Sequence, residues 1–240
     1  MKVRKRTIGA LLVLILVLIA GCTGQSNRLP KSEATIEGKV IGLRDGGFLL
    51  ASETGGLIYA STNTPIYNME GVLSDASALK NGQVVEIGFS GMIMESYPGQ
   101  LGDPKYIKIV EQQDDMAGLY GRIISDILVA DSGLRSNDEY VVMDLSQITN
   151  LSEVEKQALI NLMSLNVGLI GVSGNLDDFM NYGYSENGIF TAFEIKETTD
   201  VSIKFDLYKM HKGEDAYYFR DALAKKANGN WAYTVTTQGK

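Results

Sequence analysis

The residues that most often build active sites are scarce in this chain of 240 residues. It contains one cysteine, Cys22, and one histidine, His211. A single cysteine excludes a disulfide within the chain, and a single histidine excludes zinc sites of the His-Glu-x-x-His type. Neither a Gly-x-Ser-x-Gly elbow nor a glycine-rich phosphate loop is present. The sequence therefore predicts no catalytic residue, no metal site and no cofactor.

Carboxylates remain as possible catalytic groups. Acidic residues are adjacent at Asp114/Asp115, Asp138/Glu139, Asp177/Asp178 and Glu214/Asp215. Two acids suffice for a glycosidase, and several could hold calcium, although no Asp-x-Asp-x-Asp-Gly loop occurs. In so acidic a chain we expect these pairs on solvated loops, and we expect His211 in a solvated turn. A carboxylate-dependent hydrolase is the alternative; it requires two acids from distant segments to converge in one partly buried pocket.

The chain also lacks a hydrophobic run long enough to span a membrane. Its longest apolar run, 8–20, has 13 residues, whereas a spanning helix needs about 20. A basic segment, 2–6, precedes the run, and Ile19-Ala20-Gly21-Cys22 follows. This pattern is typical of a secretory signal, and its end resembles the lipobox of bacterial lipoproteins. We expect residues 1–21 to be a lipoprotein signal peptide and Cys22 to carry acyl chains such as palmitate. A short uncleaved anchor and a free thiol are the alternatives.

Positive charge is scarce once such a signal is removed. Four of the 22 basic residues lie in it, leaving 18 against 29 acidic residues, a formal charge of −11. Nucleic-acid binding needs Lys and Arg to neutralise phosphates, so this balance argues against a nucleic-acid partner. It also argues against lying flat on an anionic membrane. The expected partners are the membrane, through the lipid on Cys22, and an envelope protein or wall ligand on the extracytoplasmic face of the cell membrane.

The residues after Cys22 divide into a tether and two domains. Residues 22–34 are polar and predict a flexible tether. Residues 35–112 predict a five-stranded barrel of the OB type, with a short helix near 74–79. The predicted strands are 35–43, 48–52, 57–62, 83–94 and 106–110.

In OB barrels the loop between the last two strands often contacts the ligand. Here this loop carries Glu95, Ser96, Tyr97 and Gln100, which we predict as candidate ligand-binding residues. The alternative is a structural turn in which Pro98-Gly99 sets the corner and Tyr97 packs on the barrel.

Two segments of this first domain carry a family resemblance. Lys80-Asn81-Gly82-Gln83-Val84-Val85-Glu86 resembles the entry to the fourth strand of OB barrels. Gly91-Met92-Ile93-Met94-Glu95-Ser96-Tyr97-Pro98-Gly99-Gln100 resembles an uncharacterised OB-like domain of Gram-positive lipoproteins. The resemblance implies a barrel over about 35–112 and implies no activity.

Residues 116–240 predict an α+β domain. Apolar residues recur with helical spacing from Leu119 to Leu128, and Ser152-x-x-Glu155 is a capping box that opens a second helix. A strand is expected at 140–145, another at 167–172, and a short helix at 175–182. Four further strands, 189–196, 201–210, 216–226 and 231–237, predict a four-stranded antiparallel meander with the helices packed on it.

This second domain also resembles a known family. The resemblance lies in Asp131-Ser132-Gly133-Leu134, Glu139-Tyr140, Asp144-Leu145-Ser146, Leu151-Ser152-Glu153, Glu155-Lys156, Ala216-Tyr217-Tyr218-Phe219, Ala224-Lys225-Lys226 and Trp231. The family is an uncharacterised secreted Gram-positive domain that also follows membrane metallopeptidases. Their zinc motif is absent, so the resemblance implies no protease activity. We therefore expect a cell-envelope lipoprotein that acts as a non-enzymatic binding module rather than as an enzyme.

Overall fold

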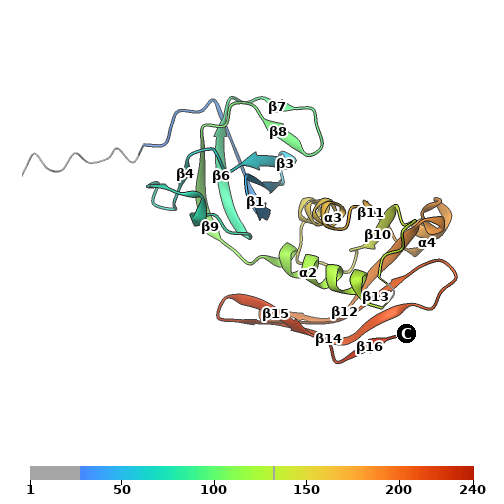
Figure 1. The fold of residues 1–240 in the computed structure, drawn as a ribbon. Helices are drawn as coiled ribbons and strands as arrows, with labels where there is room; N and C mark the ends of the chain where they lie inside the picture. Colours follow the sequence, from blue (N-terminus) through green and yellow to red (C-terminus); the bar gives the residue numbers. More distant parts are fainter. Residues whose placement is uncertain (1–27, 132) are drawn as a thin grey trace, which may run out of the picture.

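The computed structural model describes residues 28–131 and 133–240 of the chain. The predicted signal peptide, Cys22 and the tether as far as residue 27 lie outside the described residues. The described part is mixed α+β, as the sequence predicts, with two β-sheets and helices between and beside them (Figure 1). None of the described helices is long and apolar enough to span a membrane.

Residues 34–112 form a nine-stranded sheet, here called the N-terminal sheet. Its strand order is β5-β4-β9-β6-β1-β2-β3-β8-β7. This corrects the prediction of five strands: the short strands β4, β5 and β8 lie outside the predicted ones, where their two or three residues are too few to show a period. The short helix near 74–79 is a single 3-10 turn, η1 (Ala76–Ala78), capped by Asp75. The strands are β1 (Ala34–Arg44), β2 (Gly47–Ser52), β3 (Gly56–Ser61), β4 (Ile66–Tyr67), β5 (Leu73–Ser74), β6 (Gln83–Phe89), β7 (Ile93–Met94), β8 (Gly99–Leu101) and β9 (Tyr106–Gln112).

The two ends of the N-terminal sheet are linked by the short strand β4. It follows β3 after four residues, yet it pairs in parallel with β9 on the far side of the sheet order, with Ile66 opposite Ile107. The long strand predicted over 83–94 is divided: β6 ends at Phe89, and Gly91, with φ of 83°, turns the chain into the β7–β8 hairpin. Glycine adopts such a positive φ at no steric cost.

Residues 140–239 contain a second, seven-stranded sheet, the C-terminal sheet. Its order is β11-β10-β12-β13-β14-β15, and β16 pairs with β14. The strands are β10 (Tyr140–Asp144), β11 (Ile170–Ser173), β12 (Gly188–Thr199), β13 (Ser202–Met210), β14 (Tyr217–Ala227), β15 (Asn230–Thr234) and β16 (Thr237–Gly239). The helices of this part are α2 (Met116–Val129), α3 (Glu153–Val167), α4 (Leu176–Asn181) and the 3-10 turn η2 (Tyr184–Glu186).

The C-terminal sheet is larger than the four strands that the sequence predicts for it. β12 to β15 pair antiparallel in chain order, but β10 and β11 also join this sheet, and β10 runs parallel to both β11 and β12. Strands buried on both faces show no apolar alternation. Val141, Val142 and Met143 of β10 are fully buried. The run of apolar residues therefore predicts a strand, but it does not indicate which strands pair with it.

The helix ends follow the predicted capping residues. In α3 the Ser152 side chain accepts from the Glu155 amide and the Glu155 carboxylate accepts from the Ser152 amide, which confirms the capping box. Gly168 ends α3 in a left-handed conformation with φ of 72°. The predicted short helix is α4, whose N-cap is Asn175.

One hydrophobic core is shared by the two parts of the molecule. All six residues of β2 are buried. Phe48 and Leu50 face the interior of the N-terminal sheet, whereas Leu49 and Ala51 belong to the cluster built around α2 and α3. Both helices contact β1, and α3 also contacts β2 and β3. The outer face of β1–β3 is therefore covered by the helices of the C-terminal part (Figure 1).

Candidate functional site

The predicted binding loop is the tip of the β7–β8 hairpin, and it stands clear of the sheet. Glu95, Ser96, Tyr97 and Gln100 are all exposed. The Tyr97 ring is 69% exposed, so it does not pack on the barrel as the turn alternative requires. The loop is held by its own bonds: the Ser96 amide donates to the Met94 carbonyl at 2.9 Å and its hydroxyl to the Pro98 carbonyl at 2.8 Å.

Apolar side chains accompany Tyr97 on this hairpin. Met92 is 62% exposed, and Ile93 and Met94 are exposed as well. Gln100 borders a small pocket of about 130 Å³ together with Tyr59, its exposed neighbour on β3. Large exposed apolar patches on soluble proteins mark sites of interaction. We call Met92, Ile93, Met94 and Tyr97 the hairpin patch.

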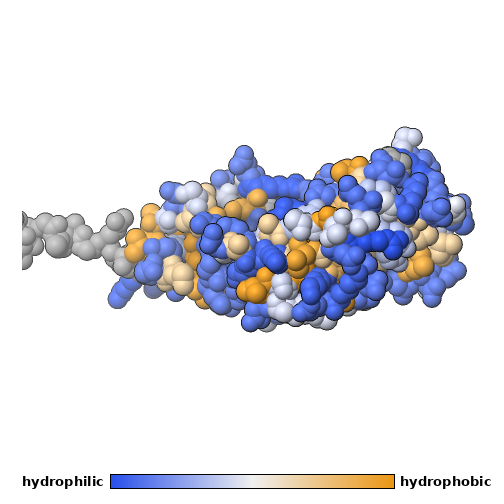
Figure 2. Space-filling view, turned by 90° about the horizontal axis from the view of Figure 1, so that it is seen from below, coloured by the Kyte–Doolittle hydropathy of each residue, from blue (hydrophilic) through white to orange (hydrophobic). Residues whose placement is uncertain are grey.

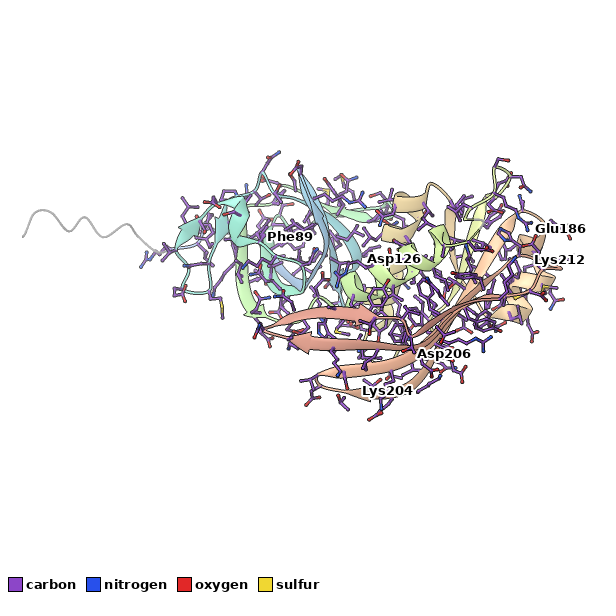
Figure 3. All side chains as sticks on the ribbon, turned by 60° about the horizontal axis from the view of Figure 1, so that its bottom comes forward. Phe89, Asp126, Glu186, Lys204, Asp206 and Lys212 are labelled. Carbon is purple, nitrogen blue, oxygen red and sulfur yellow. The ribbon has the colours of Figure 1, made fainter. Side chains whose placement is uncertain are left out.

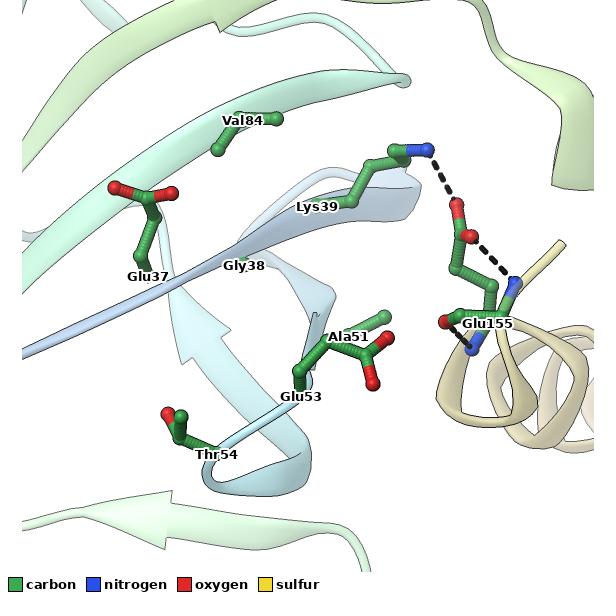
Figure 4. A pocket seen from close by; sticks show the side chains of 9 residues that line it. Glu37, Gly38, Lys39, Ala51, Glu53, Thr54, Val84 and Glu155 are labelled. Atoms are coloured by element: carbon green, nitrogen blue, oxygen red, sulfur yellow. Dashed lines mark hydrogen bonds and ion pairs between the residues drawn. The ribbon is translucent and has the colours of Figure 1, made fainter.

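A second candidate region is the cleft between the two parts, with a volume of about 300 Å³ (Figure 4). Glu37 and Glu53 come from the N-terminal sheet and Glu155 from α3, so acids from distant segments line one cleft. Glu37 and Glu53 are exposed at its rim. Glu155 is buried, and both its oxygens are engaged: Oε2 by the Ser152 amide at 2.8 Å and Oε1 by the Lys39 ammonium at 2.6 Å. The buried carboxylate is thus committed to structure.

His211 corrects a prediction made from the sequence. It is not in a solvated turn: it is 5% exposed, and its Nε2 lies 3.1 Å from the carboxylate of Asp138, which is itself buried. Asp138 also accepts from the Arg135 amide at 2.7 Å. The turn that follows is exposed and carries an ion pair between Lys212 and Glu186, labelled in Figure 3. The His211–Asp138 pair ties the loop before β10 to the end of β13.

A buried lysine lies on the same face of β13 as His211. Lys209 is 4% exposed, and its ammonium donates to the carbonyls of Leu128 and Ala130 at the end of α2. Burial lowers the pKa of Lys209, and the nearby carboxylates of Asp131 and Asp138 oppose that shift. Cations near a helix C-terminus satisfy its orphan carbonyls, so Lys209 serves as a cap for α2.

A third cavity, larger than the inter-part cleft, was not predicted from the sequence. Val142 packs with Phe179 of α4 on one face of β10, whereas Met143 packs with Leu159 of α3 on the other. The loops after β10 and β11 therefore lead to opposite faces, which opens a crevice at the carboxyl ends of these strands, the usual ligand position in parallel sheets. The crevice measures about 460 Å³ and is lined by Met143, Asp144, Leu145, Ser146, Glu153, Lys156, Ser173, Gly174 and Asn175.

The charged groups of this crevice already have partners. Lys156 donates to Glu153 at 2.8 Å, and Asp144 accepts from the Ser146 amide at 3.0 Å. In the sequence, this crevice could have been recognised from the polar residues that directly follow the two short apolar strands β10 and β11. Among the described residues, no three His, Cys, Asp or Glu side chains lie close enough to hold a metal ion.

The aromatic residues of the last strands divide between core and surface. Phe219 is buried, whereas Tyr217 and Trp231 are partly exposed. On the other face Tyr208 and Tyr218 are cross-strand neighbours with ring centroids 5.5 Å apart. The Trp231 ring nitrogen donates to Asp114, which also pairs with Lys226 at 2.8 Å. These contacts fasten the β14–β15 hairpin to the segment between the two parts.

Comparison with known proteins adds no assignment. No protein-family model, no curated protein and no solved structure matches the chain. The two family resemblances drawn from the sequence therefore stay predictions.

Proposed function

We propose that the protein is a lipoprotein on the outer face of the cytoplasmic membrane, anchored through Cys22, and that it is a binding module rather than an enzyme. The proposal places its contact site at the hairpin patch. The observation that carries it is the exposure of Met92 and Tyr97 on a hairpin that is braced by its own hydrogen bonds. A loop that is already ordered by its own hydrogen bonds loses little conformational entropy on binding, so more of the free energy of contact remains as affinity.

The topology supports an OB-type barrel in the N-terminal part. The five long strands β1, β2, β3, β6 and β9 pair in the order β9-β6-β1-β2-β3, and β4 brings the chain after β3 back to β9. OB barrels bind ligands on the face of their second and third strands and on two loops. Here α3 covers that face, and Arg44, at the first of those loops, bonds to Asn166 of α3. The hairpin between β6 and β9 is the loop that stays open.

The membrane anchor and the contact site have separate tests. Mass spectrometry of the native protein should find acyl mass on Cys22, and Cys22→Ser should release or stall the protein. An N-terminus still at Met1 would contradict the anchor.

The contact site is tested by a photoreactive residue at position 97 in intact cells, with position 182 as the matched control. Tyr182 is as exposed as Tyr97, at 72%. A partner captured from 97 should be absent from 182, and it should be lost in Met92→Ser, which removes apolar surface at the base of the same hairpin. A second test uses Tyr97→Ala and a triple change of Glu95, Ser96 and Gln100 to Ala. Full retention of the partner in both variants would show that the contact site is not on this loop.

One observation favours a carboxylate-dependent hydrolase as a second candidate: Glu37 and Glu53, from separate segments of the N-terminal part, line the inter-part cleft. In this alternative Glu37 and Glu53 act, because Glu155 is held by Lys39 and Ser152. The test is hydrolysis of wall polymers or peptides by the purified protein. A rate lost in the Glu37→Gln, Glu53→Gln double variant would establish the enzyme and overturn the non-enzymatic proposal.

A further inference from the structure

A second exposed apolar surface lies on the β4–β5 hairpin. Met69, Val72 and Leu73 are 53%, 43% and 55% exposed, and we call them the β4–β5 patch. The loop is braced: the Val72 amide donates to the Asn68 side chain at 2.8 Å, and the Asn68 amide donates to the Val72 carbonyl at 2.9 Å. The backbone of this hairpin is therefore held in one conformation that leaves the three side chains exposed.

The described chain begins next to this patch. The Glu33 amide donates to the Phe89 carbonyl at 3.0 Å, and Tyr106 lies opposite the neighbouring Gly88 in the sheet. The Tyr106 ring packs edge-on against Tyr67, with centroids 6.3 Å apart. Tyr67 is the last residue of β4 and leads directly into the loop. In Figures 1 and 3 the described chain starts on this side of the barrel, and Figure 2 shows apolar residues at this end of the molecule as well as in its middle and at its far end.

The length of chain between Cys22 and this end is short. Six peptide units separate Cys22 from Arg28, so they reach about 20 Å when fully extended. If acyl chains on Cys22 lie in the bilayer, the β4–β5 patch cannot move far from the lipid surface. Charge does not oppose the approach: the segments at this end carry the basic residues Arg28, Lys31 and Lys108 and the acidic residues Glu33, Glu70 and Asp75, which balance.

From this arrangement we propose that the β4–β5 patch inserts into the interfacial region of the bilayer beside the lipid anchor. The proposal rests on the proposed lipidation of Cys22. Apolar side chains on a surface gain free energy when they leave water, and the anchor removes most of the cost of bringing them to the lipid. Insertion would fix the orientation of the molecule, with the membrane at the β4 end and α4 at the far end (Figure 1).

The test uses the full lipidated protein in vesicles of phosphatidylethanolamine and phosphatidylglycerol. Leu73→Cys is labelled with an environment-sensitive maleimide fluorophore; the control is Met180→Cys on α4, which is exposed and apolar but lies at the opposite end. The proposal expects the emission at 73 to move to shorter wavelength and to be quenched by lipids that carry a head-group quencher. The emission at 180 should show neither effect.

The same samples separate failure of the anchor from failure of the insertion. Acylated Cys22 cannot react, so each chain should take up one fluorophore; two per chain would refute the lipidation itself. One fluorophore per chain with unshifted emission at 73 refutes the insertion alone. A shift at 73 that needs an added membrane protein, and does not occur with lipid, would make the occupant a protein and also overturn the proposal. Met69→Gln with Val72→Thr should reduce the shift at 73.

Discussion

The ion pair between Lys39 and Glu155 joins the two parts of the molecule, and removing its charge should destabilise both. Lys39 lies on β1 and Glu155 on α3; their side chains are only 20% and 10% exposed, and their charged atoms are 2.6 Å apart. Breaking a fully buried pair costs 3–5 kcal/mol and an exposed pair less than about 1 kcal/mol. For this partly buried pair we expect Glu155→Gln to cost about 2 kcal/mol.

Two substitutions of Glu155 distinguish the contribution of its charge from its contribution to the helix cap. Glutamine can still accept from the Ser152 amide in a capping box, whereas alanine cannot. Glu155→Ala should therefore cost about 1 kcal/mol more than Glu155→Gln, which is the usual cost of a lost cap. In a Lys39→Met background, Glu155→Gln should be close to neutral, because no ammonium is left unpaired.

The assay is urea unfolding followed by circular dichroism and by the fluorescence of Trp231, the single tryptophan. The matched control is Glu153→Gln, because Glu153 pairs with Lys156 at a similar distance but is 84% exposed. This control should change the free energy of unfolding by less than about 0.5 kcal/mol. Equal losses in Glu153→Gln and Glu155→Gln, or additive effects of Lys39→Met and Glu155→Gln, would refute the reasoning.

Three further predictions concern stability and domain organisation. His211→Ala removes the side-chain partner of the buried Asp138 carboxylate and leaves it only the Arg135 amide, so it should lower the free energy of unfolding by about 3 kcal/mol in the same assay; a loss below about 0.5 kcal/mol would refute the role of this pair. Burial alone would raise the pKa of Asp114, but hydrogen bonds from its neighbours outweigh it and lower the pKa. Asp114 therefore stabilises the fold above its unfolded pKa of about 3.9 and loses that effect as the pH falls through its folded value, so Asp114→Asn should lose less stability than the wild type between about pH 5 and pH 2. Limited proteolysis tests the division into two domains near 111–117. Because Asp114 in this segment bonds to Trp231 and Lys226 of the β14–β15 hairpin, we expect cleavage within 22–34 first. Equally fast cleavage within 22–34 and within 111–117 would show that these contacts hold the segment only weakly.

Local features of the fold were predictable because their signals are local. The capping box of α3, the end of that helix at Gly168 and the positions of β1, β2, β3 and β9 depend on residues that are neighbours in the chain. The pairing of β10 with β11 and β12 depends on contacts between distant segments, and a doubly buried strand carries no period that reveals them. For the same reason the shared core on β2 was not foreseen.

The error on His211 had a signal that could have prevented it. Ile203, Phe205, Leu207 and Lys209 are buried in alternation along β13, and His211 continues that period of two. The turn residues Lys212-Gly213 suggested solvent, and they are indeed exposed, but the histidine before them still belongs to the strand face. For the candidate loop at 95–100, the sequence identified the residues. The exposure of Tyr97 could not be predicted, because a turn has no regular alternation of buried and exposed positions.

The double burial of β2 has a consequence for how the chain must fold as it is made. Synthesis proceeds from the N-terminus, so β1–β3 emerge well before α3, which lies about a hundred residues further along. Until α3 arrives, Leu49, Ala51 and Leu57 have no cover on their outer side. A nascent N-terminal part therefore presents an uncovered apolar surface for a definite interval, and a truncation that stops before residue 153 would leave that surface open to aggregation or to chaperones.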